Sequence, residues 1–351
     1  MKHSIKPSDK YLVWFYILAL FFSSNLWAQK HAQPLKFETY QDLYYSHSFN
    51  SQSQTPDFFF NHKRLQAPSS NLTLLKTSYI DSVYTLELGL MSGDYARFNL
   101  AQEPSWASVL STAFLERKIK SNQRIMAGIF SSYIGIETSV SSDCSLLTRS
   151  IASENTPYYF SGFRYLKSLE RMNCSFYLLN GWQRIAWNAQ NRIPAFGSNL
   201  QFKLKPEFEI QHSLFIGYAK PDSLRALRIY QHVNCKLIRT WGSGYATFDL
   251  GIENGFLWLS PQLIADFTLN PHQRLAVRLE WFWDPHKCQI FVDGPKGFNT
   301  LGLALCHTYT GIKNMDFRVE VKYYQSEQPP YNRFENRFYL SSGLSYRFCS
   351  E

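Results

Sequence analysis

Apolar and polar residues alternate with a period of two through much of this chain. From Leu275 to Trp283 every second residue is apolar, and the other parity carries Arg278 and Glu280. The same alternation returns from Phe317 to Tyr323. A period of two predicts β-strands rather than helices, because successive side chains of a strand point to opposite faces.

Further segments of this kind follow one another along the chain, and we expect each to form a strand. They are residues 35–49, 71–78, 82–92, 108–119, 122–130, 157–167, 172–181, 196–205, 207–218, 226–237, 244–252, 259–270, 272–283, 299–310, 315–325 and 334–348. The pattern is weaker after the ninth and eleventh segments. The sequence therefore predicts about 16 strands, within a range of roughly 14 to 18.

The lengths of the connections distinguish a membrane barrel from a soluble β-sandwich. Those after the first, third, fifth, seventh and thirteenth strands are long, namely 50–70, 93–107, 131–156, 182–195 and 284–298. Those after the second, fourth, sixth, eighth and twelfth strands are short. Short turns at one end and long loops at the other are typical of bacterial outer-membrane barrels, and Greek-key sandwiches have no such alternation. The predicted fold is all-β, a transmembrane antiparallel β-barrel.

The composition and the N-terminus agree with an exported barrel. Aromatic residues make up 17% of the chain, yet the mean hydropathy is −0.28, as expected where apolar and polar residues alternate. Residues 1–28 combine three lysines with a short apolar run that ends in small residues, which predicts a secretory signal peptide rather than an uncleaved anchor helix. We expect residues 29–351 to form one barrel domain in the outer membrane.

Four stretches give a family resemblance. They are FETYQDLYYSHSFN, AGIFSSYIGIETSV, LLTRSIASENTPYYFSG and LLNGWQRI. These residues resemble the OmpL-like β-barrel porins of Gram-negative outer membranes, most specifically from about residue 122 to 186. The resemblance implies an exported porin but names no solute. Trimers are familiar among porins, so a homo-oligomer is compatible with it, although no sequence feature establishes one.

The long segment after the fifth strand is the third long loop. By analogy with general porins we expect residues 131–156 to fold inward and narrow the lumen, rather than to pack on the outer rim. Its charged residues Glu137, Asp143, Arg149 and Glu154 are our candidates for a constriction. Charged side chains at a narrowing determine which ions pass.

The charged parity of the late strands supplies candidate pore-lining residues. They are Arg274, Arg278, Glu280, Arg318, Glu320, Lys322, Arg337 and Arg347. The formal charge of the chain is +9. Residues 1–28 carry three lysines against one aspartate, so +7 remains for the mature chain, which favours a mild anion preference.

The sequence offers little for catalysis or cofactors. We find no nucleophile elbow, no H-E-x-x-H pair and no glycine-rich phosphate loop, and we expect no catalytic residues, metal or cofactor. The basic residues are not clustered, so nucleic acid is not an expected partner. The expected partners are outer-membrane lipid and small hydrophilic solutes or ions.

The predicted function is passive diffusion of small hydrophilic solutes through the barrel. One alternative is a non-conducting barrel with a plugged lumen, whose aromatic segment 55–64 would contact a partner protein. A barrel-embedded enzyme is a third possibility, for which no catalytic set is found.

Overall fold

The structure, a computed structural model, describes residues 35–49, 54–187, 192–220, 224, 226–292, 296–326 and 336–350. The predicted signal peptide, residues 1–28, lies outside these ranges. Sixteen strands are described: β1 (Leu35–Ser48), β2 (Ser69–Ile80), β3 (Tyr84–Ser92), β4 (Leu110–Lys120), β5 (Gln123–Ser131), β6 (Tyr159–Ser168), β7 (Met172–Leu179), β8 (Ala195–Lys205), β9 (Phe208–Tyr218), β10 (Leu227–Arg239), β11 (Gly242–Glu253), β12 (Phe256–Asn270), β13 (Gln273–Asp284), β14 (Phe298–Ile312), β15 (Met315–Ser326) and β16 (Asn336–Cys349).

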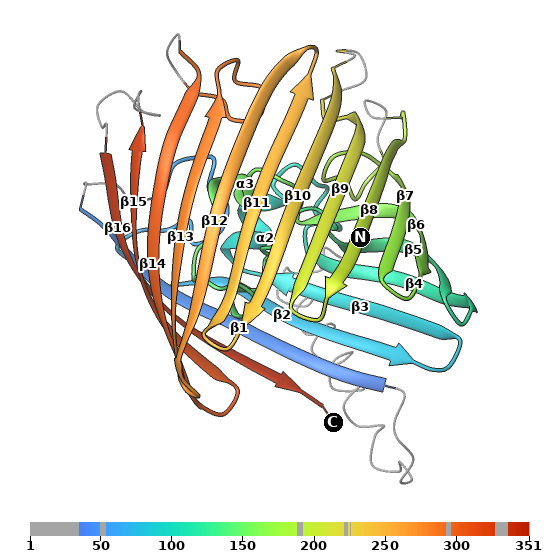
Figure 1. Ribbon diagram of the computed structural model, residues 1–351, viewed down its shortest axis with the longest axis horizontal. Helices are drawn as coiled ribbons and strands as arrows, with labels where there is room; N and C mark the ends of the chain where they lie inside the picture. Colours follow the sequence, from blue (N-terminus) through green and yellow to red (C-terminus); the bar gives the residue numbers. More distant parts are fainter. Residues whose placement is uncertain are drawn as a thin grey trace, which may run out of the picture. The chain divides into compact units, whose positions relative to one another are not determined.

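The strands form one closed antiparallel barrel (Figure 1). Each strand pairs with its neighbours in the sequence, and β1 pairs with β16 from Glu38 opposite Cys349 to Ser48 opposite Tyr339. Closure leaves no unpaired sheet edge, which is the requirement for a sheet surrounded by lipid. The predicted barrel and its strand number are confirmed.

The predicted strand ends agree with the structure to within three residues. The largest difference is at β12, which begins at Phe256 because the turn after β11 is only Asn254 and Gly255. Both turn residues have positive φ, 50° and 83°, as a two-residue hairpin turn requires, and Asn-Gly favours it. The weak pattern after the eleventh strand therefore reflects a tight hairpin at the end that otherwise carries long loops.

The outward face of the barrel is apolar. Leu86, Leu88 and Leu90 of β3 alternate with inward residues and are each more than 40% exposed. A continuous surface of this kind would be a large exposed apolar patch in water, whereas lipid accepts it. No helix among the described residues is long and apolar enough to cross a membrane.

Two short helices lie in the long loops. Helix α2 (Asp94–Asn99) follows β3 and contacts β2, and α3 (Ile151–Glu154) lies between β5 and β6 and contacts β13. Both are seen behind β10–β12 in Figure 1, and Tyr95 and Ala96 of α2 share a buried cluster with the inward residues Tyr40 and Leu74. The two loops that carry them thus fold toward the interior.

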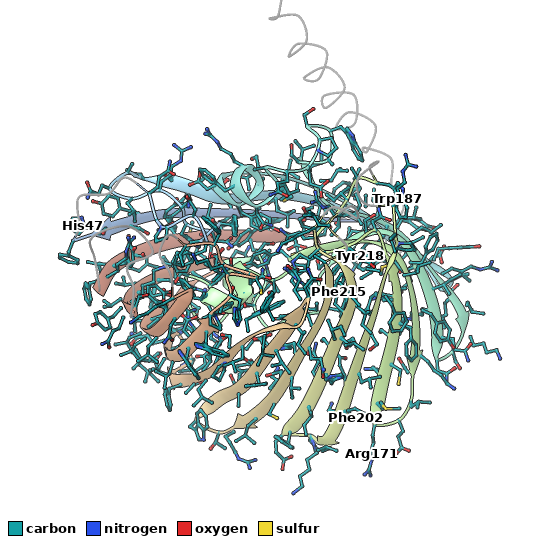
Figure 2. The ribbon with its side chains drawn as sticks, turned by 90° about the horizontal axis from the view of Figure 1, so that it is seen from above. His47, Arg171, Trp187, Phe202, Phe215 and Tyr218 are labelled. Carbon is teal, nitrogen blue, oxygen red and sulfur yellow. The ribbon has the colours of Figure 1, made fainter. Side chains whose placement is uncertain are left out.

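The inward parity is not uniformly polar. It also carries large aromatic side chains, among them Phe160, Tyr177, Phe215, Tyr230 and Trp258, all of which are buried. Figure 2 shows Phe215 pointing into the interior. This buried cluster was not predicted from the sequence.

Two glycines allow neighbouring strands to bend where they meet. Gly128 of β5 lies opposite Gly162 of β6, with φ values of +132° and +151°. A Cβ added at Gly128 would lie 2.1 Å from the carbonyl oxygen of Ala113 on β4. The backbone there is therefore closed to any side chain.

We expect Gly128→Ala to destabilise the barrel by on the order of 1–3 kcal/mol, because alanine adds both the clash and an unfavourable φ. The control is Gly244→Ala on β11, where the nearest atom to the added Cβ would be 3.6 Å away. The measurement is the temperature at which the barrel loses its heat-modifiable mobility on a denaturing gel. Equal temperatures for the two variants would contradict the assignment of strain to Gly128.

Candidate functional site

The loop between β5 and β6, residues 132–158, folds into the barrel; we call it the inner loop. It includes most of the segment that the sequence predicts as a constriction. Its residues contact inward side chains of the first strand, β1, and of three strands late in the chain, β13, β15 and β16. The inner loop therefore crosses the lumen rather than resting on the rim.

Arg278 of β13 is the main attachment point. Its Nη1 donates to the carbonyl oxygen of Thr148 at 2.8 Å and lies 3.3 Å from Oε1 of Glu137. Its Nη2 donates to the carbonyl oxygen of Arg149 at 3.1 Å. The side chain has no solvent exposure. One guanidinium thus binds the entry and the middle of the inner loop at once.

Acidic residues of the wall bind backbone amides of the inner loop. Glu280 accepts the amide of Ile151 at 2.6 Å and pairs with Arg278 at 3.1 Å. On β15, Glu320 accepts both the amide, at 3.0 Å, and the hydroxyl of Thr148. Each buried carboxylate therefore has charged or amide donors, which burial of a charge requires.

Arg318 adds a further attachment. Its Nη1 donates to the carbonyl oxygens of Ser141 at 2.5 Å and Leu146 at 3.1 Å. Leu146 and Leu147 pack against small wall residues, Ala276 and Ala304. These small side chains leave room for the inner loop to lie directly on the wall.

Two charged residues of the inner loop shape the loop itself. Arg149 donates to the carbonyl oxygens of Thr138 and Leu147 and to the hydroxyl of Ser141, and it is fully buried. Glu137 accepts from the amide and hydroxyl of Ser150, the residue that caps α3. Both therefore fold the loop rather than face an open channel.

The aromatic segment 55–64 covers the inner loop from the side of the long loops. Glu154 accepts the backbone amides of Phe60 at 2.8 Å and Asn61 at 3.2 Å. Phe59 is buried in the aromatic cluster. The sequence suggested this segment as a surface for a partner protein, but its central residues bind the inner loop instead.

The predicted pore-lining residues all lie on the inward parity of their strands. Two of them, Arg274 and Arg347, have side chains that are about one third exposed. The other six are at most 5% exposed: Arg278, Glu280, Arg318, Glu320, Lys322 and Arg337. Five of these six bind the inner loop directly, namely Arg278, Glu280, Arg318, Glu320 and Lys322. Contact of these charges with a solute stays a prediction, and Arg274 and Arg347, which meet water, are each already paired with an acid.

The four predicted constriction residues are separated. Glu137, Arg149 and Glu154 are buried in contacts of the inner loop, whereas Asp143 is 43% exposed and pairs with Arg347 at 2.8 Å. Asp143 is therefore the one member of the group that meets solvent and the wall together.

The opposite wall of the lumen was not singled out from the sequence. Asn199 of β8 and Gln211 and Ser213 of β9 all donate to the carbonyl oxygen of Tyr133 at the start of the inner loop. Next to this contact lies a hollow of about 390 Å³, lined mainly by residues of β6–β9. Its polar residues include Arg164, Asn173, Ser175, Asn199, Gln201 and Gln211. Strand parity places each of them inward, and that signal was available in the sequence.

The two buried glutamates of the inner loop have pKa values shifted in opposite directions. Burial raises the pKa of Glu154, and the amides of Phe60 and Asn61 offset this only in part, so its pKa lies above its ordinary value. Burial also acts to raise the pKa of Glu137, but Arg278 and Ser150 outweigh it, so its pKa lies below its ordinary value. Glu137 is thus held as a carboxylate, whereas ionisation of Glu154 costs stability.

No group of three or more metal-ligating side chains is present in the part of the chain that the structure describes.

One protein family matches almost the whole chain. The family described as "Putative beta-barrel porin-2, OmpL-like" covers residues 34–341. A search of curated proteins finds no match.

Solved porin structures share the fold at low sequence identity. The OmpF complex with daunomycin from Salmonella typhi is 12% identical, with a TM-score of 0.61, and 90% of this chain covers 97% of it. The anion-selective porin from Comamonas acidovorans is 8% identical, with a TM-score of 0.59 and coverage of 90% and 99%. The trimer form of OmpT from Vibrio cholerae is 7% identical, with a TM-score of 0.57 and the same coverage. At these identities the likeness concerns the fold.

We expect Arg278→Met to release the inner loop. The substitution leaves Glu137 and Glu280 buried without their guanidinium, and breaking a buried ion pair in this way costs about 3–5 kcal/mol. Hydrogen–deuterium exchange in peptides from 132–158 should become much faster. The control is Arg274→Met on the same face of β13, whose pair with Asp266 is partly exposed and contributes about 0–1 kcal/mol. Slow exchange in the Arg278 variant would contradict its role as the attachment point.

The two glutamates predict opposite pH behaviour of the inner loop. When folding raises the pKa of a carboxyl, the folded state loses stability as the pH rises from the unfolded pKa, 4.5, through the folded pKa. Glu154→Gln removes this loss, so it should slow hydrogen exchange of the inner loop near pH 8 and abolish the pH dependence due to Glu154. A carboxyl whose pKa is lowered contributes stability above 4.5 that is lost on acidification, so Glu137→Gln should speed exchange near pH 8. Exchange corrected for its intrinsic pH dependence checks both. The same direction of change in both variants would contradict the assignment.

Proposed function

Because this chain belongs to the OmpL-like β-barrel porin family of the outer membrane, we propose that it lets small hydrophilic solutes and ions diffuse passively across that membrane. The observation that carries the proposal is the polar, partly uncovered inner wall of a closed 16-stranded barrel. Barrels of about 16 to 18 strands are wide enough for an aqueous channel, whereas barrels of about eight are filled by side chains.

The lumen divides into two halves with different roles. The wall of β13–β16 and β1 is covered by the inner loop, and its charges hold that loop in place. The wall of β6–β9 keeps a polar hollow with amide, hydroxyl and guanidinium groups. Hydrated solutes would pass along this second wall. The inner loop then narrows the channel, because it removes the other half of the cross-section.

We also propose how the protein is exported and how it assembles. Residues 1–28 would direct export and be removed, and the barrel would act without catalysis. A homo-oligomer is supported by the fold likeness to a porin solved in a trimer form.

A second candidate is a barrel that is closed at rest. The burial of six wall charges and the aromatic cluster between the loops and β6–β12 favour it, because both take up space that a channel would need. In that case the loops would have to move before solutes could pass, or the barrel would have a structural role.

Single-channel recording distinguishes the two candidates. We expect the refolded mature chain, residues 29–351, to give steady conductance steps in a planar bilayer, and Arg278→Met to give larger steps because it frees the inner loop. Arg117→Met, on the outward parity of β4, is the matched control and should leave the step size close to that of the unmodified chain. A folded, heat-modifiable barrel without steps, which conducts only after Arg278→Met, would contradict diffusion at rest and support the closed barrel.

A further inference from the structure

We propose that the channel prefers small anions, and that this preference is set by the inward basic residues of β4, β8 and β10 near the short-turn end rather than by the charges around the inner loop. The preferred solutes would carry a carboxylate or phosphate group. This inference rests on the proposed diffusion function and names its solute class and its selectivity residues.

The charges around the inner loop are poorly placed to select solutes. Arg278 and Glu320 have no solvent exposure, and their hydrogen-bonding atoms are taken by the inner loop. A buried group of this kind cannot exchange its partners for a passing ion without the cost of leaving other charges unpaired. Selectivity must then come from residues that meet water.

Three lysines face the lumen just inside the short-turn end of the uncovered half. Lys203 of β8 lies opposite Glu209 of β9, which in turn lies opposite Lys236 of β10. Lys118 of β4 lies opposite Arg124 of β5. Directly opposed residues of paired strands point to the same face, and Gln211 and Ser213 show that this face of β9 is the inner one.

These lysines have little compensating charge. No ion pair joins Lys118, Lys203 or Lys236 to an acid among the residues that the structure describes, and Lys236 instead lies over the ring of Tyr245 at 5.6 Å. The inward acids of this region are Glu209 and Glu116, and Glu207 in the turn before β9 pairs with Arg239. Glu116 is already paired with Arg124 and Arg164. The short-turn end of the lumen, which we call the inner mouth, therefore carries a net positive charge in this half.

The other half of the same mouth is different. There Lys76 pairs with Glu38 at 3.5 Å, Arg274 with Asp266 at 3.1 Å, and Arg347 with Asp143 at 2.8 Å. Its positive and negative groups cancel locally, so the field across the mouth is asymmetric. A mouth lined by one sign of charge raises the local concentration of ions of the opposite sign.

The hollow next to this mouth suits anions as well. Its lining contains one charged residue, Arg164, and otherwise amides, hydroxyls, aromatic rings, Leu166 and Gly135, with no carboxylate. Asn173, Ser175 and Gln201 can donate hydrogen bonds to carboxylate or phosphate oxygens. An anion that enters along the lysines therefore meets further donors, and the acid next to the hollow, Glu116, is already balanced by Arg124 and Arg164.

The test compares two sets of charge reversals at the same rim. The inward triple is Lys118→Glu, Lys203→Glu and Lys236→Glu. The outward triple is Arg117→Glu, Lys167→Glu and Arg239→Glu, which makes the same change in net charge on the lipid-facing parity. Reversal potentials are measured in a KCl gradient near 0.1 M, where the Debye length is about 10 Å. The inward triple should lower the ratio of chloride to potassium permeability by roughly threefold or more, and the outward triple should leave it unchanged.

The outcomes separate this inference from the function on which it rests. An unmodified chain that prefers potassium, or an equal change from both triples, would overturn the anion assignment while the diffusion function stands. If the inward triple does not fold, the corresponding Lys→Gln triple replaces it. That triple should lower the ratio of chloride to potassium permeability by a smaller factor.

A second readout does not need current. In a cysteine-free background, Gln201→Cys would react with an anionic and a cationic methanethiosulfonate of similar size. We expect the ratio of the anionic to the cationic reaction rate to be higher at this cysteine than at a free thiol in solution. This ratio should fall in the inward triple. If the barrel carries no current, the diffusion function fails. Separately, a reagent preference that is absent in the unmodified chain, or unchanged in the inward triple, would overturn the assignment of a positive inner mouth.

Discussion

The buried guanidinium of Arg278 is the contact on which the interior of this barrel depends. It lies on β13, and it holds Glu137, Thr148 and Arg149 of a loop more than a hundred residues earlier in the chain. A buried charge must be paired and fully hydrogen-bonded, so only a narrow range of loop positions is compatible with it. Glu280 and Glu320 then bind the amides of Ile151 and Thr148 from the same wall. The path of the inner loop follows from these requirements.

The barrel itself could be predicted closely from the sequence, and the physical reason is local. Lipid requires apolar residues on one parity of each strand, so the positions from Leu275 to Trp283 report the direction of their side chains without any knowledge of distant residues. The hairpin at Asn254 and Gly255 was harder to place, because a tight turn among long loops breaks the regular alternation. Even there the Asn-Gly pair is a local signal that favours such a turn.

The interior could be predicted only in part. Parity places Arg278 and Arg318 inward, but it does not tell whether water or a loop meets them. That depends on contacts between residues far apart in the sequence, such as Glu137 and Arg278. The sequence does contain indications of the loop. Ala276, Ala304 and Gly343 are small residues on the inward parity, and they leave room for another segment to pack against the wall. A Cβ at Gly343 would lie 2.5 Å from Leu147, so the small residue marks where the loop lies on the wall. Large inward aromatic residues such as Phe215 are a second indication that the lumen is partly packed.

The division of the lumen explains how an interior can be both rigid and permeable to ions. Where the loop excludes water, charges interact strongly, and each acid needs its base and its amide donors. Where the wall stays wet, as at Lys118 and Lys203, charges need no partner because water solvates them, and an unbalanced sign is tolerated. Buried charge on the covered half therefore serves attachment, and the charges there that meet water, Arg274 and Arg347, are balanced by acids, so the unbalanced charge available to act on a solute lies on the wet half. A count of basic residues over the whole chain mixes these two populations, so the sign of selectivity follows from which residues the inner loop leaves uncovered.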